Sequence, residues 1–447
     1  MAKIVIIGAG SGFGGHLSID IMAREFLRDS TICLCDIHEG RLKGIYEYVK
    51  RTAEYHKLPT KVVASTDRRE LLPDADFVVT SIAQGGGAYW GSPYREEVEI
   101  PAKYGIYQTV ADTVSVGAVF RFLRTGPVQQ QIFRDLEELC PDAWVLNHTN
   151  PMCMLSWLHC VDTQMRYAGL CHGVQGTTKE LAKLIDVPYD EISFKVAGIN
   201  HLAWILEFMR GKEDLYPKVW KLLEDPEKVK GEEVRFELMK NFGYFPTESN
   251  RHDAEYVPYF RKNESDMESF PIPPRHPVPM EPRKHREWMK DTGADGNEEK
   301  AVGQLKKSHE YTTGIMEAIL TNVPYSFQGN VMNHGGLIEN LPENCCVEVP
   351  CLVDARGIHP CYVGKLPTQC AALNRTNVNV HELAVEAVLN KDREAAFHAC
   401  AVDPLTAAIL PLDKIREMFE EMWTALEPHL KWFDPNHTGP LPERCAE

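Results

Sequence analysis

The feature that most constrains this chain is its N-terminal segment KIVIIGAGSGF, in which an apolar run ends in closely spaced glycines. The run predicts a buried strand, and residues 15–27 predict the helix that follows it. Gly8 and Gly10 occupy the first two positions of a G-x-G-x-x-G pattern, and Ser11 comes next. Such a turn brings backbone N–H groups and a helix N-terminus close to a pyrophosphate. The segment therefore predicts a strand–turn–helix unit that binds a dinucleotide.

Two further residues bear on this dinucleotide site. The third glycine position of the pattern falls on Phe13, so we expect the helix to lie further from the strand, or the Phe13 ring to face the ligand. Asp36 ends the second apolar strand, TICLCD. An acidic side chain there binds the ribose hydroxyls of NAD and disfavours a 2′-phosphate. NAD is therefore the expected cofactor.

Strand and helix patterns alternate through the first half of the chain. Further strands are predicted in KVVAST, DADFVVTSIA, AWVLNHTNP and YAGLCH, and the apolar stretch FKVAGINHLAWILEF is expected to run through the core. This alternation is typical of a doubly wound parallel sheet. We expect a Rossmann-like NAD-binding domain over residues 1–196. Residues 197–447 are expected to form a mixed α+β domain for catalysis and oligomerisation, as in lactate and malate dehydrogenases.

The second half of the chain changes character along its length. Residues 211–310 are rich in charge and proline and predict helices and long loops, with PRHPVPMEPRKHR as a solvated loop. From Tyr311 the pattern is helical, then strand-like in CCVEVPCLVD, then helical again.

Composition excludes several classes of protein. The net charge of −16 without a basic stripe argues against nucleic acid or an anionic membrane as partner. The chain has no apolar run long enough to span a membrane, and its N-terminal run is too short for a signal peptide. Thirteen scattered cysteines without a C-x-x-C pair indicate reduced thiols. We therefore expect a cytoplasmic protein.

Polar side chains follow three of the predicted strands. Asn150 ends the fifth strand, Cys171 and His172 end the next one, and His201 in GINH ends the strand after that. Ligands of open α/β sheets bind at the carboxyl ends of the strands. A thiolate and an imidazole there could hold a divalent cation with open positions for substrate oxygens. The residues alone leave a second possibility, a buried thiol beside a core histidine.

The motifs of the whole chain resemble those of one family. They are GAGS, CDI, DADFVV, YGIYQTVADT, LNHTNPM, GLCHGVQGT, AGINH, TESNRHDAEYVPYF, GNVMNHGGLIENLP, CCVEVPCLVDARGI and VGKLP. Together they resemble the NAD- and metal-dependent glycoside hydrolases of family 4, and within them the α-galactosidases of the melibiase type. Two departures concern the sugar. Gly173 replaces the serine of C-H-S-V-Q, as in uronidase-type relatives, and SVGA at Ser115–Ala118 replaces G-P-G-G.

The resemblance implies an oxidation–elimination mechanism. NAD⁺ takes a hydride from sugar C3, a divalent metal, usually Mn²⁺, stabilises the enediolate, and a base removes the C2 proton. The leaving group departs, water adds and the hydride returns. By position, Cys171 and His201 match the metal ligands and His172 matches the acid that protonates the leaving oxygen. Asn150 matches a residue near the metal that contacts substrate and cofactor.

The remaining roles implied by the resemblance concern the sugar itself. Asp112 and His252 are assigned to substrate binding, and Tyr256 to the C2 base. His252, Glu248 and Glu255 are the alternatives for the base. The expected substrate is a small α-galactoside, and α-glucosides, α-galacturonides and α-glucuronides are the alternatives. A homodimer or homotetramer is expected.

Two readings from other classes stay open on the sequence. A metal-independent 2-hydroxy-acid dehydrogenase would use Asp36 and Asn150 but has no need of Cys171 and His201. A protein that only senses NAD is the other. Net NADH separates them, because a dehydrogenase accumulates it, the hydrolase returns it, and a sensor cleaves nothing.

Overall fold

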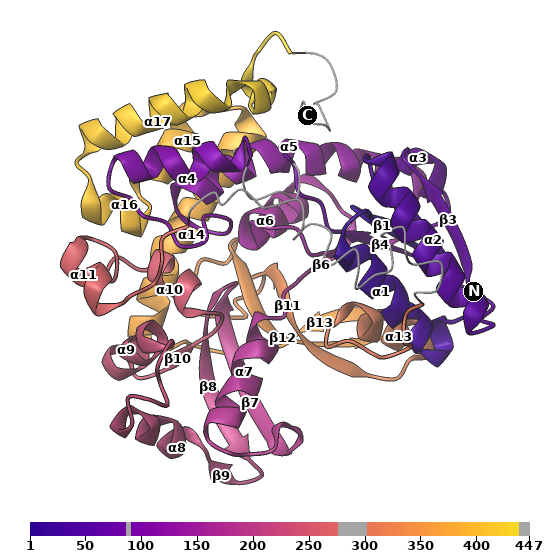
Figure 1. The fold of residues 1–447 in the computed structure, drawn as a ribbon, viewed down its shortest axis with the longest axis horizontal. Helices are drawn as coiled ribbons and strands as arrows, with labels where there is room; N and C mark the ends of the chain where they lie inside the picture. Colours follow the sequence, from indigo (N-terminus) through magenta and orange to yellow (C-terminus); the bar gives the residue numbers. More distant parts are fainter. Residues whose placement is uncertain (86–90, 276–301, 438–447) are drawn as a thin grey trace.

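A parallel sheet forms the N-terminal half of the molecule, as expected. The computed structural model describes residues 1–85, 91–275 and 302–437, and within them one sheet of 13 strands runs through the fold (Figure 1). Its parallel part has the strand order β3-β2-β1-β4-β5-β6, which is that of doubly wound dinucleotide-binding folds. The strands are β1 (Lys3–Ile7), β2 (Thr31–Cys35), β3 (Lys61–Ser65), β4 (Phe77–Thr80), β5 (Trp144–Asn147) and β6 (Arg166–Leu170).

The central strands of this part of the sheet are apolar and buried on both faces. Helices must therefore cover both faces of the sheet. The helices in this half of the chain are α1 (Gly12–Ala23), α2 (Glu39–Tyr55), α3 (Arg68–Leu71), α4 (Tyr94–Lys103), α5 (Ser115–Leu139), α6 (Met152–Asp162) and α7 (Gly173–Leu184), with the 3₁₀ turns η1 (Glu25–Leu27) and η2 (Tyr189–Glu191). Of these, α4 packs on α5 and α17, and α7 packs on β7, beyond the parallel strands.

The first helix lies close to its strand, so the expected wider approach at Phe13 is wrong. A Cβ atom on Gly14 would lie 2.3 Å from the carbonyl oxygen of Ala9. Gly14, one residue later than the usual position, therefore supplies the close packing of the third glycine. The Phe13 ring packs against His148, with ring centroids 4.5 Å apart.

The apolar stretch FKVAGINHLAWILEF does cross the core, but as two antiparallel strands. β7 (Ile192–Ile199) and β8 (Leu202–Arg210) meet at a tight turn, where His201 has a φ of 64°. The sheet continues from β6 through the antiparallel strands β11, β12, β7, β8 and β10, with no break at residue 196. The domain boundary at 196 stays a prediction. The other strands are β9 (Glu213–Asp214), β10 (Phe245–Pro246), β11 (Tyr325–Met332), β12 (Cys346–Asp354) and β13 (Gly357–Pro360).

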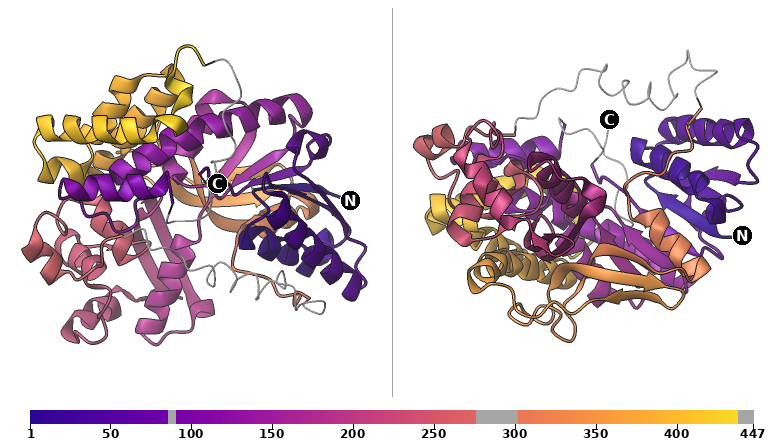
Figure 2. Two further views of the ribbon diagram at one scale, coloured as in Figure 1. Left: turned by 45° about the horizontal axis from the view of Figure 1, so that its top comes forward. Right: turned by 90° about the horizontal axis from the view of Figure 1, so that it is seen from below.

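The C-terminal helices gather at the opposite end of the molecule from the N-terminal strands (Figure 2). There α14 and α15 contact α5, and α17 contacts α4. The remaining helices are α8 (Tyr216–Lys221), α9 (Glu233–Phe242), α10 (Asn250–Tyr256), α11 (Glu264–Ser269), α13 (Thr312–Thr321), α14 (Thr368–Asn390), α15 (Arg393–Ala401), α16 (Pro404–Ile409) and α17 (Leu412–Leu426), with the 3₁₀ turns η3 (Leu222–Glu224), η4 (Glu427–His429) and η5 (Lys431–Phe433).

The segment after residue 211 has the mixed character that its charge and proline content predict. Helices, strands and loops alternate between residues 211 and 275, and the predicted proline-rich loop lies outside the described residues from position 276 onward. None of the helices described here combines the length and the apolar character that crossing a bilayer requires.

Candidate active site

The glycine turn after β1 is built for a close ligand. Gly8 has a φ of 91°, and a Cβ there would lie 2.1 Å from the carbonyl oxygen of Ser81. A Cβ on Gly10 would lie 2.7 Å from Cγ of Asp36, so both positions require glycine. The Ser11 hydroxyl donates to the Gly8 carbonyl (3.1 Å) and does not cap α1. The N-terminus of α1 is thus left to other acceptors, which fits a dinucleotide phosphate.

Asp36 lies immediately after β2 and faces this turn. Its carboxylate accepts hydrogen bonds from the N–H groups of Gly10 and His38, both at 2.8 Å. The side chain is therefore held at the edge of the glycine loop, where a ribose acceptor is needed. Asn150 follows β5 at the same end of the parallel strands and is partly buried.

Cys171 and His201 come together although 30 residues separate them in the chain. Cys171 follows β6, and His201 forms the turn between β7 and β8. Their Sγ and Nε2 atoms lie 3.2 Å apart. One carboxylate oxygen of Glu248, which precedes α10, joins them, and the three ligand atoms lie within 4.8 Å of one another. The sequence alone indicates Glu248 only as an alternative for the base.

The electrostatics of this cluster suit a cation. Burial lowers the pKa of His201 to about 4, so its imidazole is neutral and can act as a ligand. Burial raises the pKa of the Cys171 thiol well above its ordinary value, and the carboxylates of Glu348 and Glu248 raise it further. Burial, followed by the charge of Glu248, raises the pKa of Glu348 on β12 to about 8. Both raised pKa values mean that the negatively charged forms are disfavoured here. A divalent ion would offset that cost, and the thiol, imidazole and carboxylate suit a transition metal.

His172 lies at the mouth of this cluster. It precedes α7, and its side chain is 73% exposed. Its Nδ1 lies 3.3 Å from Oε1 of Glu310, whose other carboxylate oxygen lies 3.9 Å from Nδ1 of His148. The hydrogen bond to Glu310 raises the pKa of His172 against the opposing effect of burial. An exposed imidazole with a carboxylate behind it can carry and donate a proton.

Of the other predicted site residues, His252 and Asp112 lie beside His201, whereas Tyr256 and Glu255 are buried. The His252 ring packs on the His201 ring with centroids 4.4 Å apart, and its Nε2 lies 3.8 Å from Oδ1 of Asp112. Both side chains keep some exposure, 14% for His252 and 15% for Asp112. Tyr256 is only 1% exposed and belongs to the main hydrophobic core, where burial raises its pKa well above 10. Glu255 is equally buried and binds the backbone N–H groups of Thr109–Ala111.

The position of Tyr256 argues against its predicted role. A general base must reach the proton that it removes, and its deprotonated form must be accessible near the working pH. In this structure the Tyr256 phenol is buried and its pKa is raised, so the geometry favours His252 over it, and the role of Tyr256 as the base stays a prediction. The sequence suggested it because it belongs to the TESNRHDAEYVPYF motif, but the helix α10 turns this side chain toward the core and leaves His252 at the site.

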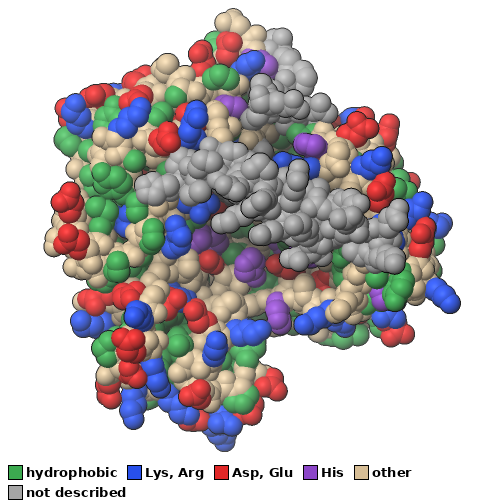
Figure 3. Space-filling view, viewed as in Figure 1, with side chains coloured by type: hydrophobic (Ala, Val, Ile, Leu, Met, Phe, Trp, Pro, Cys, Tyr) green, Lys and Arg blue, Asp and Glu red, His purple; other side chains and the backbone are tan. Residues whose placement is uncertain are grey.

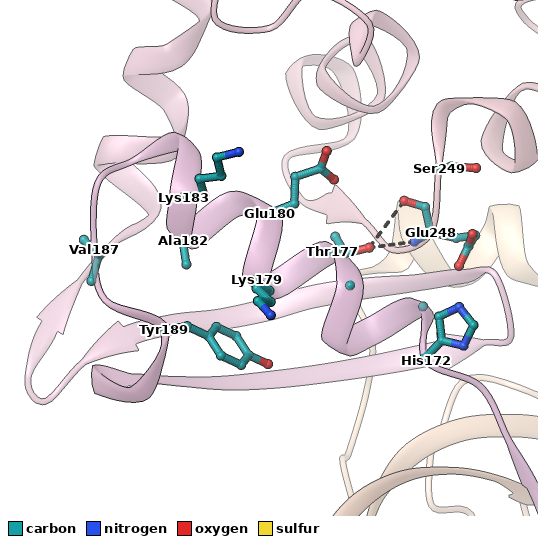
Figure 4. Close-up of a pocket in the computed structure, with 12 residues that line it drawn as sticks. His172, Thr177, Lys179, Glu180, Ala182, Lys183, Val187, Tyr189, Glu248 and Ser249 are labelled. Atoms are coloured by element: carbon teal, nitrogen blue, oxygen red, sulfur yellow. Dashed lines mark hydrogen bonds between the residues drawn. The ribbon is translucent and has the colours of Figure 1, made fainter. Parts of the chain in front are cut away.

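A groove of about 700 Å³ extends from the site along α7 (Figure 4). His172, Gly173 and Glu248 are among the residues that line it. Lys183 and Tyr189 also line it, farther from His172 (Figure 4). The face shown in Figure 3 has histidine side chains gathered at its centre, with acidic side chains beside them.

Comparison with protein families gives matches over most of the chain. Residues 3–187 match the model of the family 4 glycosyl hydrolases, and residues 196–406 match the C-terminal domain of the same family. An α-galactosidase of Bacillus subtilis (strain 168) is 40% identical, over 95% of this chain and 98% of the relative. An α-galacturonidase of Thermoanaerobacterium saccharolyticum (strain DSM 8691 / JW/SL-YS485) is 30% identical, over 96% of each.

Solved structures support the fold. A 6-phospho-α-glucosidase from gut microorganisms, in complex with NAD and Mn²⁺, superposes with a TM-score of 0.78 at 21% identity, over 95% of this chain and 98% of that one. A malate dehydrogenase from Plasmodium falciparum superposes with a TM-score of 0.52 at 14% identity, over 90% of this chain and all of that one. The expected likeness to the lactate and malate dehydrogenase fold is therefore confirmed.

Proposed function

The chain belongs to family 4 of the glycosyl hydrolases, and we propose that it is an α-galactosidase that requires NAD and a divalent metal, with Mn²⁺ as the expected ion. The observation that carries this proposal is the convergence of Cys171 and His201, 3.2 Å apart, at the strand ends that follow the glycine turn of a doubly wound sheet. A dehydrogenase that uses no metal has no need of such a pair.

The cofactors have separate places in this proposal. Gly8, Gly10 and Ser11 bind the pyrophosphate of NAD, Asp36 accepts from its ribose hydroxyls, and Asn150 contacts both cofactor and sugar. When bound, NAD⁺ supplies reversible oxidation at sugar C3, and the metal supplies Lewis acidity toward the sugar oxygens.

Cys171 and His201 hold the metal in the proposed site. His201 is suited to this because its burial keeps the imidazole neutral, and its unusual turn conformation aims the ring at Cys171. The thiol loses its proton when a cation binds, because a metal-bound thiolate is favoured over a thiol.

The proton of the leaving group comes from His172 in this proposal. Its exposure lets it reach the glycosidic oxygen, and Glu310 favours its protonated form. Asp112 and His252 contact the sugar hydroxyls, because both keep exposure beside the metal ligands whereas Tyr256 does not. The groove along α7 begins at His172, so the leaving group extends into it.

α-Galacturonides are the second candidate substrates. The observation that favours them is Gly173, which gives the C-H-G form of the central motif in place of C-H-S, together with the 30% identity to an α-galacturonidase. α-Glucosides and α-glucuronides remain the other sugars to compare.

The test is hydrolysis of p-nitrophenyl α-galactoside, α-glucoside, α-galacturonide and α-glucuronide after dialysis against a chelator, with NAD⁺ and Mn²⁺ each added or withheld. We expect release only when both are present, no net NADH, and the fastest release from the galactoside. Release without either additive would refute the mechanism, and faster release from a uronide would replace the substrate assignment.

Location and assembly complete the proposal. All cysteines in the described residues are free, which supports a reducing, cytoplasmic environment. A homodimer or homotetramer is the proposed assembly, and light scattering of the purified chain tests it.

A further inference from the structure

We propose that Glu248 is a third protein ligand of the metal, beside Cys171 and His201. This inference rests on the proposed function and extends it, because the resemblance in sequence assigns only the cysteine and the histidine. Four separate features of the structure support it: the position of the carboxylate, the backbone that presents it, the space left for it, and its chemistry.

The position of the carboxylate is the first feature. One ligand atom from each of Cys171, His201 and Glu248 lies within 4.8 Å of the other two. Across residues 1–85, 91–275 and 302–437, no other three His, Cys, Asp or Glu side chains converge as closely. A cation of ordinary size fits between three donors at this separation after small side-chain adjustments.

The backbone of Glu248 is the second feature. Its φ is 76°, a left-handed conformation that is costly for a residue with a side chain. Three contacts hold it there. Its N–H donates to Oγ1 of Thr177 at 2.9 Å, and that hydroxyl lies 3.3 Å from its carbonyl oxygen (Figure 4). Nη1 of Arg235 donates to the same carbonyl oxygen at 2.6 Å. Thr177 and Arg235 are both buried. The fold thus maintains a strained conformation that points Glu248 at Cys171.

The space for the carboxylate is the third feature. A Cβ atom on Gly173 would lie 2.4 Å from Oε2 of Glu248. Such a contact is far too short, so any residue other than glycine at 173 must push the carboxylate away. Gly173 therefore permits Glu248 to approach the metal ligands, which gives a physical reason for glycine in the GLCHGVQG motif.

The chemistry of the donors is the fourth feature. A carboxylate oxygen is a harder ligand than a thiolate or an imidazole, and Mn²⁺ favours oxygen donors. Three protein ligands also leave positions open for two sugar oxygens. Nδ1 of His252 lies 3.4 Å from Oε1 of Glu248, so this ring can orient the carboxylate in the way that partners of metal ligands do.

The experiment measures Mn²⁺ binding to the full chain without substrate, by the electron paramagnetic resonance signal of free Mn²⁺. We expect Glu248→Gln to raise the Kd by about 10-fold or more. Gly173→Ala should also raise the Kd for Mn²⁺, although all three ligands are still present, because the added methyl group displaces the Glu248 carboxylate. Glu310→Gln is the matched control: it removes a carboxylate from the same site, at His172, and should change the Kd by less than about 3-fold.

A second comparison separates this inference from the proposed function. Cys171→Ser should weaken Mn²⁺ binding strongly. If it does, but Glu248→Gln and Gly173→Ala bind Mn²⁺ like the unaltered chain, Glu248 is not a ligand and only the inference is overturned. If Cys171→Ser also binds normally, the metal site of the proposed function is refuted as well. If Glu248→Gln fails to fold, Gly173→Ala still tests whether Glu248 binds the metal. The Gly173→Ala variant should fold, because its added methyl group clashes only with the end of the flexible Glu248 side chain.

Discussion

Replacing Asp36 with alanine tests how the chain holds its cofactor. The Asp36 carboxylate is fixed by two backbone N–H groups at 2.8 Å and keeps further acceptor capacity for ribose hydroxyls. A hydrogen bond to a charged group contributes about 1.5–3 kcal/mol, and each 1.4 kcal/mol changes a dissociation constant about tenfold. We therefore expect Asp36→Ala to raise the Kd for NAD⁺ by about 10- to 150-fold.

Titration calorimetry with NAD⁺ and, in parallel, NADP⁺ measures the effect. Removing the carboxylate should weaken binding of NAD⁺ but not of NADP⁺, whose 2′-phosphate it repels. Asp67→Ala is a matched control: Asp67 follows the neighbouring strand β3 and accepts from the N–H of Arg69 at 2.8 Å, away from the glycine turn. An unchanged Kd for NAD⁺ would refute the ribose contact, and equal losses for both dinucleotides would mean that Asp36 only supports the loop.

Three other results are expected. Cys171→Ser should abolish metal-dependent hydrolysis while the Kd for NAD⁺ stays unchanged, and full activity would refute the metal assignment. His172→Gln should slow cleavage of methyl α-galactoside by about 10²- to 10⁴-fold but slow p-nitrophenyl α-galactoside far less, because only the poor leaving group needs a proton; equal losses would contradict the acid role. Burial lowers the pKa of His159 and of His381 to about 3, so between pH 3 and 6.5 the unfolded chain binds more protons than the folded one and stability falls as pH falls. Each group should cost about 1.4 kcal/mol between pH 7.5 and 5.5 in urea unfolding, and His381→Leu should remove its share of that loss.

The parallel half of the fold could be predicted because its signals are local. Each strand is a short apolar run ended by glycine or polar residues, and burial on both faces demands that composition. The role of Gly14 does not follow from the usual glycine spacing, because the physical need is only a residue without Cβ opposite Ala9. The strand β11 was not identified because Gln328 and Asn330, both buried, interrupt its apolar pattern.

The site was harder to predict than the fold. The convergence of Cys171 and His201 could be predicted because both follow apolar strands, and the ends of such strands meet at one edge of a sheet. Their role as metal ligands stays a proposal. Glu310 and Glu348 had no such marker. They reach the site from the segment before α13 and from the interior of β12, and their roles depend on pairings between distant segments. Tyr256 shows the converse difficulty: it belongs to a functional motif, but the sequence gives no sign that its side chain is buried. Its role as the base stays a prediction.

The conformation of the backbone explains why the position of a residue in a motif is not enough to predict its role. Gly8, His201 and Glu248 all have positive φ, and each lies outside regular secondary structure, beside a proposed ligand position. For Gly8 this conformation costs little and the sequence reveals it. For His201 and Glu248 it is unfavourable, and it persists only because the surrounding structure supports it, as Thr177 and Arg235 do for Glu248. Strain of this kind leaves no periodic trace in the sequence, so the residue that would complete the proposed metal site becomes visible only when the distant segments are brought together.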